Sequence, residues 1–244
     1  MLLRILASFH TRSFLKNFCY AALVSLMLPF CLLSAEKNPI PLFDPPSDWE
    51  CALADKLSPC VQIGFLGKGS TAFRPSINLA IEEVDVGLKQ YVKAVKEIHL
   101  AQTGTTWRDL GKFKTRSGEG RLTEIGSTTP LGPIKMLQMI LVSNNNAYIL
   151  TGASTKDDFL RFQEPFIKAF QSLRLTENLF SPLPVEKKAK FETFFSKLGE
   201  SIANDSQREA EWSDLQRLVI QEAPEMGTYW QFLVLKSGRE KIYR

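Results

Sequence analysis

Residues 134–142 constrain the fold of this chain more than any other segment. They are apolar throughout except at Lys135 and Gln138. A strand that is apolar on both faces belongs in the middle of a sheet that is covered on both sides. The asparagines at 144–146 then predict a hairpin into a strand at 147–151, because asparagine tolerates the left-handed backbone of tight turns. The sequence therefore predicts a β-sheet with a core on each of its sides.

Two kinds of apolar spacing occur before this segment. Residues 76–84 alternate apolar and polar side chains, which indicates a half-buried strand. Residues 88–101 place apolar side chains three and four positions apart, which predicts an amphipathic helix. A second helix contains Pro165, so it either kinks there or begins near Glu164. Shorter strands are predicted at 49–51, 61–66, 107–115 and 120–127.

The spacing is helical beyond residues 181–184, which read Ser-Pro-Leu-Pro and predict a domain boundary. A third helix carries three phenylalanines on one stripe. This stripe serves either as helix packing or as an exposed patch that docks a partner helix or a second copy. The residues concerned are Phe191, Phe194 and Phe195.

Two further helices are predicted after this stripe. Ser206 and Glu209 have the spacing of a capping box at the start of a fourth helix, which Pro224 ends or bends. Residues 229–235 fit either a helix or an edge strand. The helical spacing of the apolar residues from Met226 onward favours the helix.

The first 35 residues have the layout of a secretory signal, a basic leader followed by an apolar run at 18–33. As a helix this run would be roughly 24 Å long, short of the roughly 30 Å hydrocarbon core of a membrane. We therefore expect cleavage after Ala35. An uncleaved membrane anchor is one alternative. Lipid attachment at Cys31 is another, which the bulky Phe30 disfavours.

The charge balance disfavours nucleic-acid binding. The whole chain has a formal charge of +4, and three of its basic residues lie in the leader. Once they are removed, 27 basic side chains stand against 26 acidic ones. A nucleic-acid-binding protein needs a clear basic surplus or stripe, because neutralised phosphates supply most of its affinity.

Two cysteines, Cys51 and Cys60, follow the leader. An exported chain can keep a disulfide between them. On neighbouring strands the bridge would close a loop of about nine residues and stabilise the fold by roughly 2.6 kcal/mol. Two unpaired thiols that pack as small apolar side chains are the alternative.

Particular residues add a family resemblance. Proline and then tryptophan lead into the domain at Pro46 and Trp49. Three segments at strand and helix ends carry the rest, namely Arg-Pro-Ser-Ile-Asn-Leu at 74–79, Ala-Tyr-Ile-Leu-Thr at 147–151 and Phe-Gln-Ser-Leu-Arg at 170–174. With them, residues 49–175 resemble the PsbP-like family of exported α/β/α sandwich domains. The resemblance implies an α+β fold, an antiparallel sheet with helices on both faces, and a role in binding or assembly.

These observations divide the chain into four parts. They are a signal peptide at 1–35, a proline-rich linker at 36–47, the PsbP-like α/β/α domain at 48–180 and a helical C-terminal extension at 185–244.

No catalytic, cofactor or metal site is predicted. His99 is the only histidine after the leader, and it flanks an apolar helix stripe. Together with Cys51 and Cys60 it lacks the spacing of a zinc motif. The glycine-rich turn around Lys68 is two residues too short for a phosphate loop. Asp157 and its neighbour Asp158 are placed to favour a helix start electrostatically.

The expected function is therefore that of an exported, non-enzymatic binding or assembly factor of the periplasm or cell envelope. Its protein partner would bind the helical tail, whose apolar residues exceed what its own packing is expected to need. Those assigned to this contact are Trp212, Leu215, Val219, Met226, Trp230 and Leu233. No nucleic-acid partner is expected, and a homo-oligomer is compatible with the sequence. Contact with a membrane is expected only through the leader, if it is not cleaved.

A second hypothesis is a carrier that holds a small apolar ligand between the sheet and a helix. Its lining would be Phe159, Phe162, Phe166 and Met136.

Overall fold

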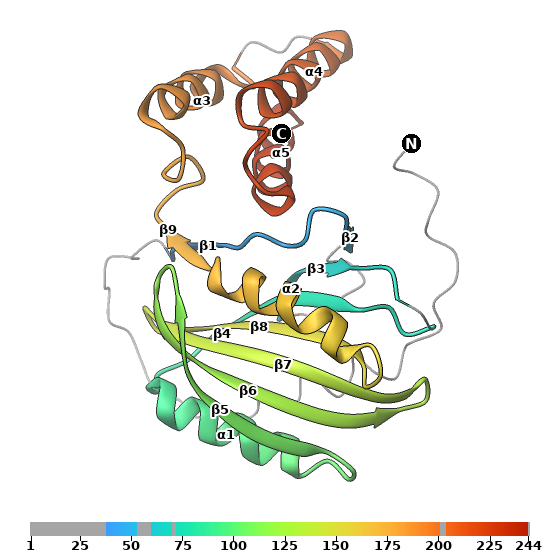
Figure 1. Ribbon diagram of the computed structural model, residues 1–244. Coiled ribbons are helices and arrows are strands. Elements are labelled where there is room, and N and C mark those ends of the chain that lie inside the picture. Colours follow the sequence, from blue (N-terminus) through green and yellow to red (C-terminus); the bar gives the residue numbers. More distant parts are fainter. Residues whose placement is uncertain (1–37, 53–59, 70–71, 201–203, 244) are drawn as a thin grey trace. The chain divides into compact units, whose positions relative to one another are not determined.

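A computed structural model describes residues 38–52, 60–69, 72–200 and 204–243 (Figure 1). The predicted signal peptide and part of the glycine-rich turn after Lys68 lie outside the described residues. The chain divides into two compact units. Of the described residues, the sheet unit contains those within 50–112 and 120–163, and the helical unit contains those within 38–49, 113–119 and 164–243.

A seven-stranded sheet has the spatial order β2-β3-β4-β8-β7-β6-β5. The strands are β2 Glu50–Ala52, β3 Val61–Leu66, β4 Ser76–Glu83, β5 Thr106–Thr115, β6 Gly118–Thr129, β7 Gly132–Ser143 and β8 Asn146–Thr155. Strand β7 pairs antiparallel with both β6 and β8. Asn144 and Asn145, with φ of 49° and 54°, turn β7 into β8. The predicted central strand and its asparagine hairpin are therefore confirmed.

The two faces of β7 belong to different cores. On one face, Ile140 lies in a buried cluster with Tyr91 and Ile149, against which the helix α1 (Leu88–Leu100) packs. On the other face, Nζ of Lys135 lies 5.0 Å from the ring centroid of Phe159, the first residue of α2 (Phe159–Gln171). Since neighbouring side chains of a strand point to opposite sides, helices meet this antiparallel sheet on both faces.

The start of α2 shows how the helix contains its proline. Oγ1 of Thr155 accepts a hydrogen bond from the backbone N of Asp158 at 3.3 Å. The carbonyl of Asp158 then accepts from the backbone N of Arg161 at 3.0 Å, which forms the first helical turn. Pro165 lies inside the helix, so the start near Glu164 is wrong.

Three helices form the core of the helical unit, α3 (Val185–Lys197), α4 (Asp205–Glu222) and α5 (Thr228–Ile242). The run 229–235 is therefore helical. The N-cap of α4 is Asn204, whose Oδ1 accepts from the backbone N of Gln207 at 3.0 Å. The predicted capping box at Ser206 and Glu209 is wrong by two residues, because the helix begins at Asp205 and Ser206 already lies inside it.

Part of the predicted linker is a strand. Residues Ile40–Leu42 form β1, which pairs antiparallel with β9 (Arg174–Thr176) in a two-stranded sheet. Leu42 is buried in the same cluster as the three helices, and the ring of Phe43 lies 5.1 Å from that of Tyr229. Apolar burial therefore holds this part of the predicted linker in the helical unit.

Candidate functional site

A surface groove lies between α3 and α4 of the helical unit. Its volume is about 460 Å³, and its lining is Ala189, Lys190, Thr193, Phe194, Lys197 and Leu218. The five α3 residues recur at intervals of three and four, so a single face of this helix forms one wall. Phe194 and Leu218 are only partly buried. The groove therefore presents apolar side chains to solvent between two helices.

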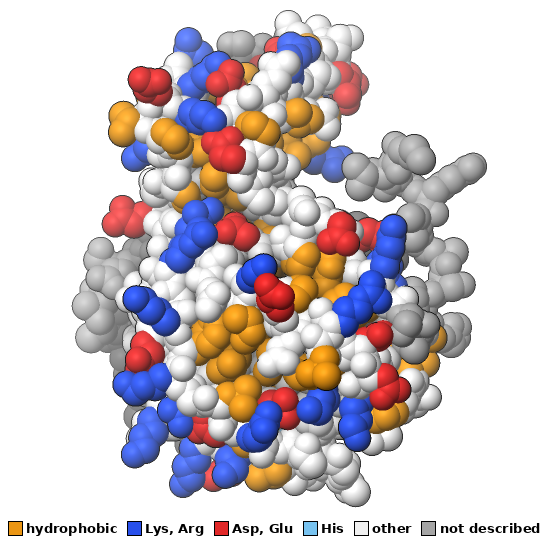
Figure 2. All heavy atoms as spheres, viewed as in Figure 1, with side chains coloured by type: hydrophobic (Ala, Val, Ile, Leu, Met, Phe, Trp, Pro, Cys, Tyr) orange, Lys and Arg blue, Asp and Glu red, His pale blue; other side chains and the backbone are white. Residues whose placement is uncertain are grey.

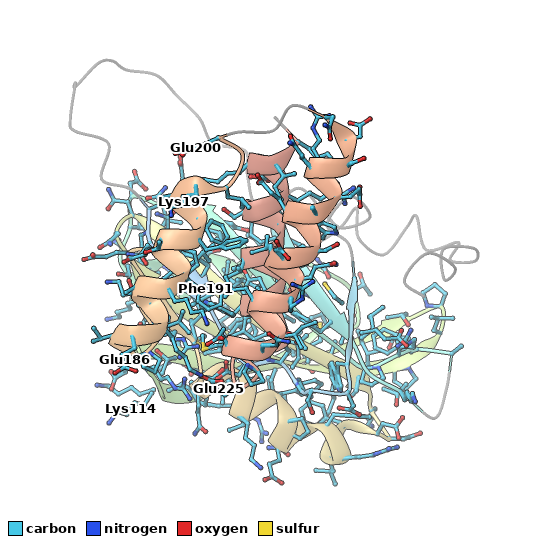
Figure 3. All side chains as sticks on the ribbon, turned by 90° about the horizontal axis from the view of Figure 1, so that it is seen from above. Lys114, Glu186, Phe191, Lys197, Glu200 and Glu225 are labelled. Carbon is cyan, nitrogen blue, oxygen red and sulfur yellow. The ribbon has the colours of Figure 1, made fainter. Side chains whose placement is uncertain are left out.

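Phe191 and Phe195 differ from Phe194, although all three belong to the predicted stripe. Both are buried in the core that α3 shares with α4 and α5. Figure 3 shows α3, α4 and α5 side by side, with Phe191 directed from α3 toward the other two helices. Phe191 and Phe195 therefore follow the interpretation of the stripe as helix packing. Phe194, which is partly exposed, follows in part the interpretation as an exposed patch.

The residues assigned to partner contact in the tail need a correction. Four of them, Leu215, Val219, Met226 and Trp230, are buried in the core of the helical unit. Trp212 and Leu233 are partly buried against the same core. The tail uses these side chains to hold its own helices together, together with Leu42 from β1, so four of the six are not on a partner surface.

The groove itself was only partly foreseeable. Phe194 belonged to a recognised stripe, but Leu218 looked like one more core position of α4. Lys190 and Lys197 carried no signal beyond their charge. Only the antiparallel packing of α3 on α4 brings these residues to one surface.

Of the two alternatives for Cys51 and Cys60, the structure does not show the disulfide. The strand register explains this. Cys51 pairs with Phe65 across the β2–β3 ladder, and Phe65 is five residues beyond Cys60 on the same extended stretch. At about 3.3 Å per residue the two cysteines are roughly 16 Å apart. A disulfide needs Cα atoms closer than about 7 Å.

The lining proposed for an apolar carrier does not come together. Phe159 faces the side of β7 that carries Lys135. Met136 is the next residue on β7 and points to the opposite side, where it packs with Ile125 and Ile134. Phe162 and Phe166 are buried. Met136 therefore cannot share a pocket with Phe159, and the predicted set is wrong in this respect.

His99 is buried near the end of α1, with its ring centroid 5.4 Å from that of Trp107. Burial lowers the pKa of its imidazole. Within the described ranges, no three His, Cys, Asp or Glu side chains are grouped as metal ligands would be. No helix in the described part of the chain has both the length and the apolarity to cross a membrane.

Acid should destabilise the fold partly through His99. Because its pKa is lower in the folded state, the unfolded chain binds the proton first as the pH falls. The free energy of unfolding should therefore fall as the pH drops below the ordinary histidine pKa. The fall should stop once the pH is below the lowered pKa of folded His99. His99→Gln should reduce this loss, measured by urea unfolding at about pH 7.5 and about pH 5.5. Equal losses in the two proteins would exclude His99 as the cause.

Charged side chains of both signs intermingle on the face of the molecule drawn in Figure 2. The charged residues in the lining of the α3–α4 groove are Lys190 and Lys197, and Lys190 forms an ion pair with Glu222 of α4.

No protein-family model matches the chain, and no curated protein does. Solved structures are similar to it at low sequence identity. One is the crystal structure of LpqN, involved in cell envelope biogenesis of Mycobacterium tuberculosis, with 11% identity and a TM-score of 0.46. That match covers 58% of this chain and 86% of LpqN.

Another similar structure is the solution structure of cyanobacterial PsbP (CyanoP) from Synechocystis. It is 12% identical, with a TM-score of 0.40, and the match covers 61% of this chain and 98% of CyanoP. A PsbP protein, of the family that the sequence resembles, is thus among the solved structures similar to this chain.

Proposed function

We propose that this protein is an exported, non-enzymatic binding or assembly factor of the periplasm or cell envelope. Its helical unit would hold a protein partner in the α3–α4 groove. The observation that carries the proposal is the partly exposed pair Phe194 and Leu218 between two antiparallel helices. The basic leader and apolar run at the N-terminus support export.

The shape of the groove favours a helical partner segment. Helices pack at interaxial distances of about 8–10 Å, with the side chains of one in the grooves of the next. A third helix laid along α3 and α4 would bury Phe194 and Leu218 together. This is the helix-in-groove mode of recognition, in which apolar anchors at three- and four-residue spacing supply the affinity.

Site-specific crosslinking tests this proposal. A photo-crosslinking amino acid at Thr193, inside the groove, should give a protein adduct in the source cell. The same amino acid at Ser213, an exposed position of α4 outside the groove lining, should not. Absence of any protein adduct at Thr193 would remove the proposal.

A matched pair of variants shows whether the groove itself does the binding. Leu218→Glu should lower the Thr193 adduct at least about tenfold, since burying a leucine contributes roughly 1.5–3 kcal/mol. Ile220→Glu makes the same change two residues along the same helix, on a side chain that is 66% exposed, and should leave the adduct unchanged. Circular dichroism of both variants checks that the helices remain folded.

A further inference from the structure

The two helices beside the groove carry opposite charge along its length. The charged side chains that α3 contributes to the lining are Lys190 and Lys197. On α4, positions four before, four after and seven before Leu218 lie on the same edge of the helix as Leu218 itself. These positions are acidic, namely Asp214, Glu222 and Glu211. Beside the groove, α3 is therefore basic at Lys190 and Lys197, and the adjoining edge of α4 is acidic, with Phe194 and Leu218 between them.

Two ion pairs fix how the walls face each other. Nζ of Lys187 lies 2.7 Å from Oε1 of Glu225, and Lys190 pairs with Glu222. In Figure 3, Glu225 accordingly lies at the end of the unit where α3 begins near Glu186. Continuing this antiparallel register places Phe194 opposite Leu218, both of which line the groove.

The opposite end of the groove has charges that are not neutralised across it. Among the residues that the structure describes, none forms an ion pair with Lys197. On the facing wall, Asp214 pairs with Arg217 of its own helix at 2.9 Å. Glu211 accepts a hydrogen bond from the backbone N of Gly199 at 2.9 Å. The same register brings Lys197 and Asp214 to the two sides of this end.

From this charge arrangement we infer that the occupant of the groove is a second copy of the same chain. A two-fold axis parallel to the helices exchanges the two walls, so α3 of each copy meets α4 of the other. The basic side of each copy then faces the acidic side of the other. Phe194 and Leu218 of one copy meet the same two residues of the other at the centre. An axis perpendicular to the helices would instead set lysines against lysines, so the charges select one arrangement.

The expected assembly is a weak four-helix contact. The face of α3 is about 20 Å long, and two helices are about 20 Å wide, which gives about 400 Å² on each copy. The total of about 800 Å² is below the roughly 1,000 Å² expected of a stable specific interface, so the dimer should be weak and dissociate readily. This inference rests on the proposed function, because it names the partner of the same groove.

Charge reversal tests the two-fold arrangement in the full mature protein. Lys197→Glu places an acidic side chain opposite Asp214 of the other copy, and Asp214→Lys places a lysine opposite Lys197 of the other copy. Each variant alone should dimerise about tenfold to a hundredfold more weakly, since every reversal occurs twice in a symmetric dimer. Mixed in equal amounts, the two variants should associate as well as the original protein. The chain that carries both reversals should also regain self-association.

Sedimentation velocity at concentrations into the hundreds of micromolar is the measurement. Lys236→Glu, on an exposed residue of α5 outside the groove, is the control and should sediment like the original protein. A monomeric original protein, or a dimer that neither reversal weakens, would overturn the inference. A Thr193 adduct with a different protein would overturn it too while leaving the proposed function intact. No adduct at all would remove both.

Discussion

Trp230→Ala should destabilise the helical unit by about 3–5 kcal/mol. The indole is 2% exposed and lies among buried side chains of all three helices. Its ring meets that of Phe191 edge-on at 5.5 Å, and its Nε1 donates to the carbonyl of Leu179 at 2.6 Å. Alanine would remove both contacts and leave a large cavity. Chemical unfolding followed by far-ultraviolet circular dichroism measures the loss.

Two further variants separate packing from hydrogen bonding. Trp230→Phe keeps most of the ring packing and removes the bond to Leu179, so it should cost about 1–3 kcal/mol. Val185→Ala truncates an apolar side chain of the same unit that is 83% exposed, and it should change stability by less than about 0.5 kcal/mol. If Trp230→Ala were as mild as Val185→Ala, the core of this unit would be wrongly described.

Gly120→Ala should destabilise the sheet unit by about 1–3 kcal/mol, although alanine suits a strand at least as well as glycine. A Cβ at this position of β6 would lie 2.5 Å from the carbonyl oxygen of Ile140 on β7. That neighbour is backbone, so relief requires the β6–β7 ladder to open. Thermal unfolding of the full chain shows the effect as a lowered midpoint.

Gly87→Ala is the matched control for this substitution. A Cβ at Gly87 meets nothing within 4 Å, and its φ of −74° suits any residue. We expect it to lower stability by less than about 1 kcal/mol, the cost of a poorer N-cap for α1. If both variants unfolded at the same temperature, close approach would not be the reason for glycine at position 120.

Strong local periodicity explains what the sequence could predict. The strand β7 was recognisable because it is apolar on both faces, and α1 because its apolar stripe is long. Because β7 is apolar on both faces, the sequence did not indicate which face packs against α2. Met136 and Lys135 are neighbours, and the apolar one was the natural choice beside Phe159. The lysine lies there, with its ammonium group over the ring.

Other features depend on partners that are distant in sequence. The strands β1 and β9 have three residues each, and β1 contains Pro41. Segments this short show no periodicity from which a strand could be predicted. In the tail, an amphipathic stripe predicts that one face of each helix is covered. It does not predict whether the same chain or another protein covers that face. For that reason Leu215 and Trp230 looked available to another protein, whereas both are buried in the core of the helical unit.

The burial of Leu42 with Ile242 has a consequence for the order in which the protein folds. These side chains come from segments two hundred residues apart, so their core cannot close until the last helix has been synthesised. The strands of the sheet unit join partners much closer along the chain and can pair earlier. The entropy lost on closing so long a loop makes the docking of β1 on these helices a late step in folding.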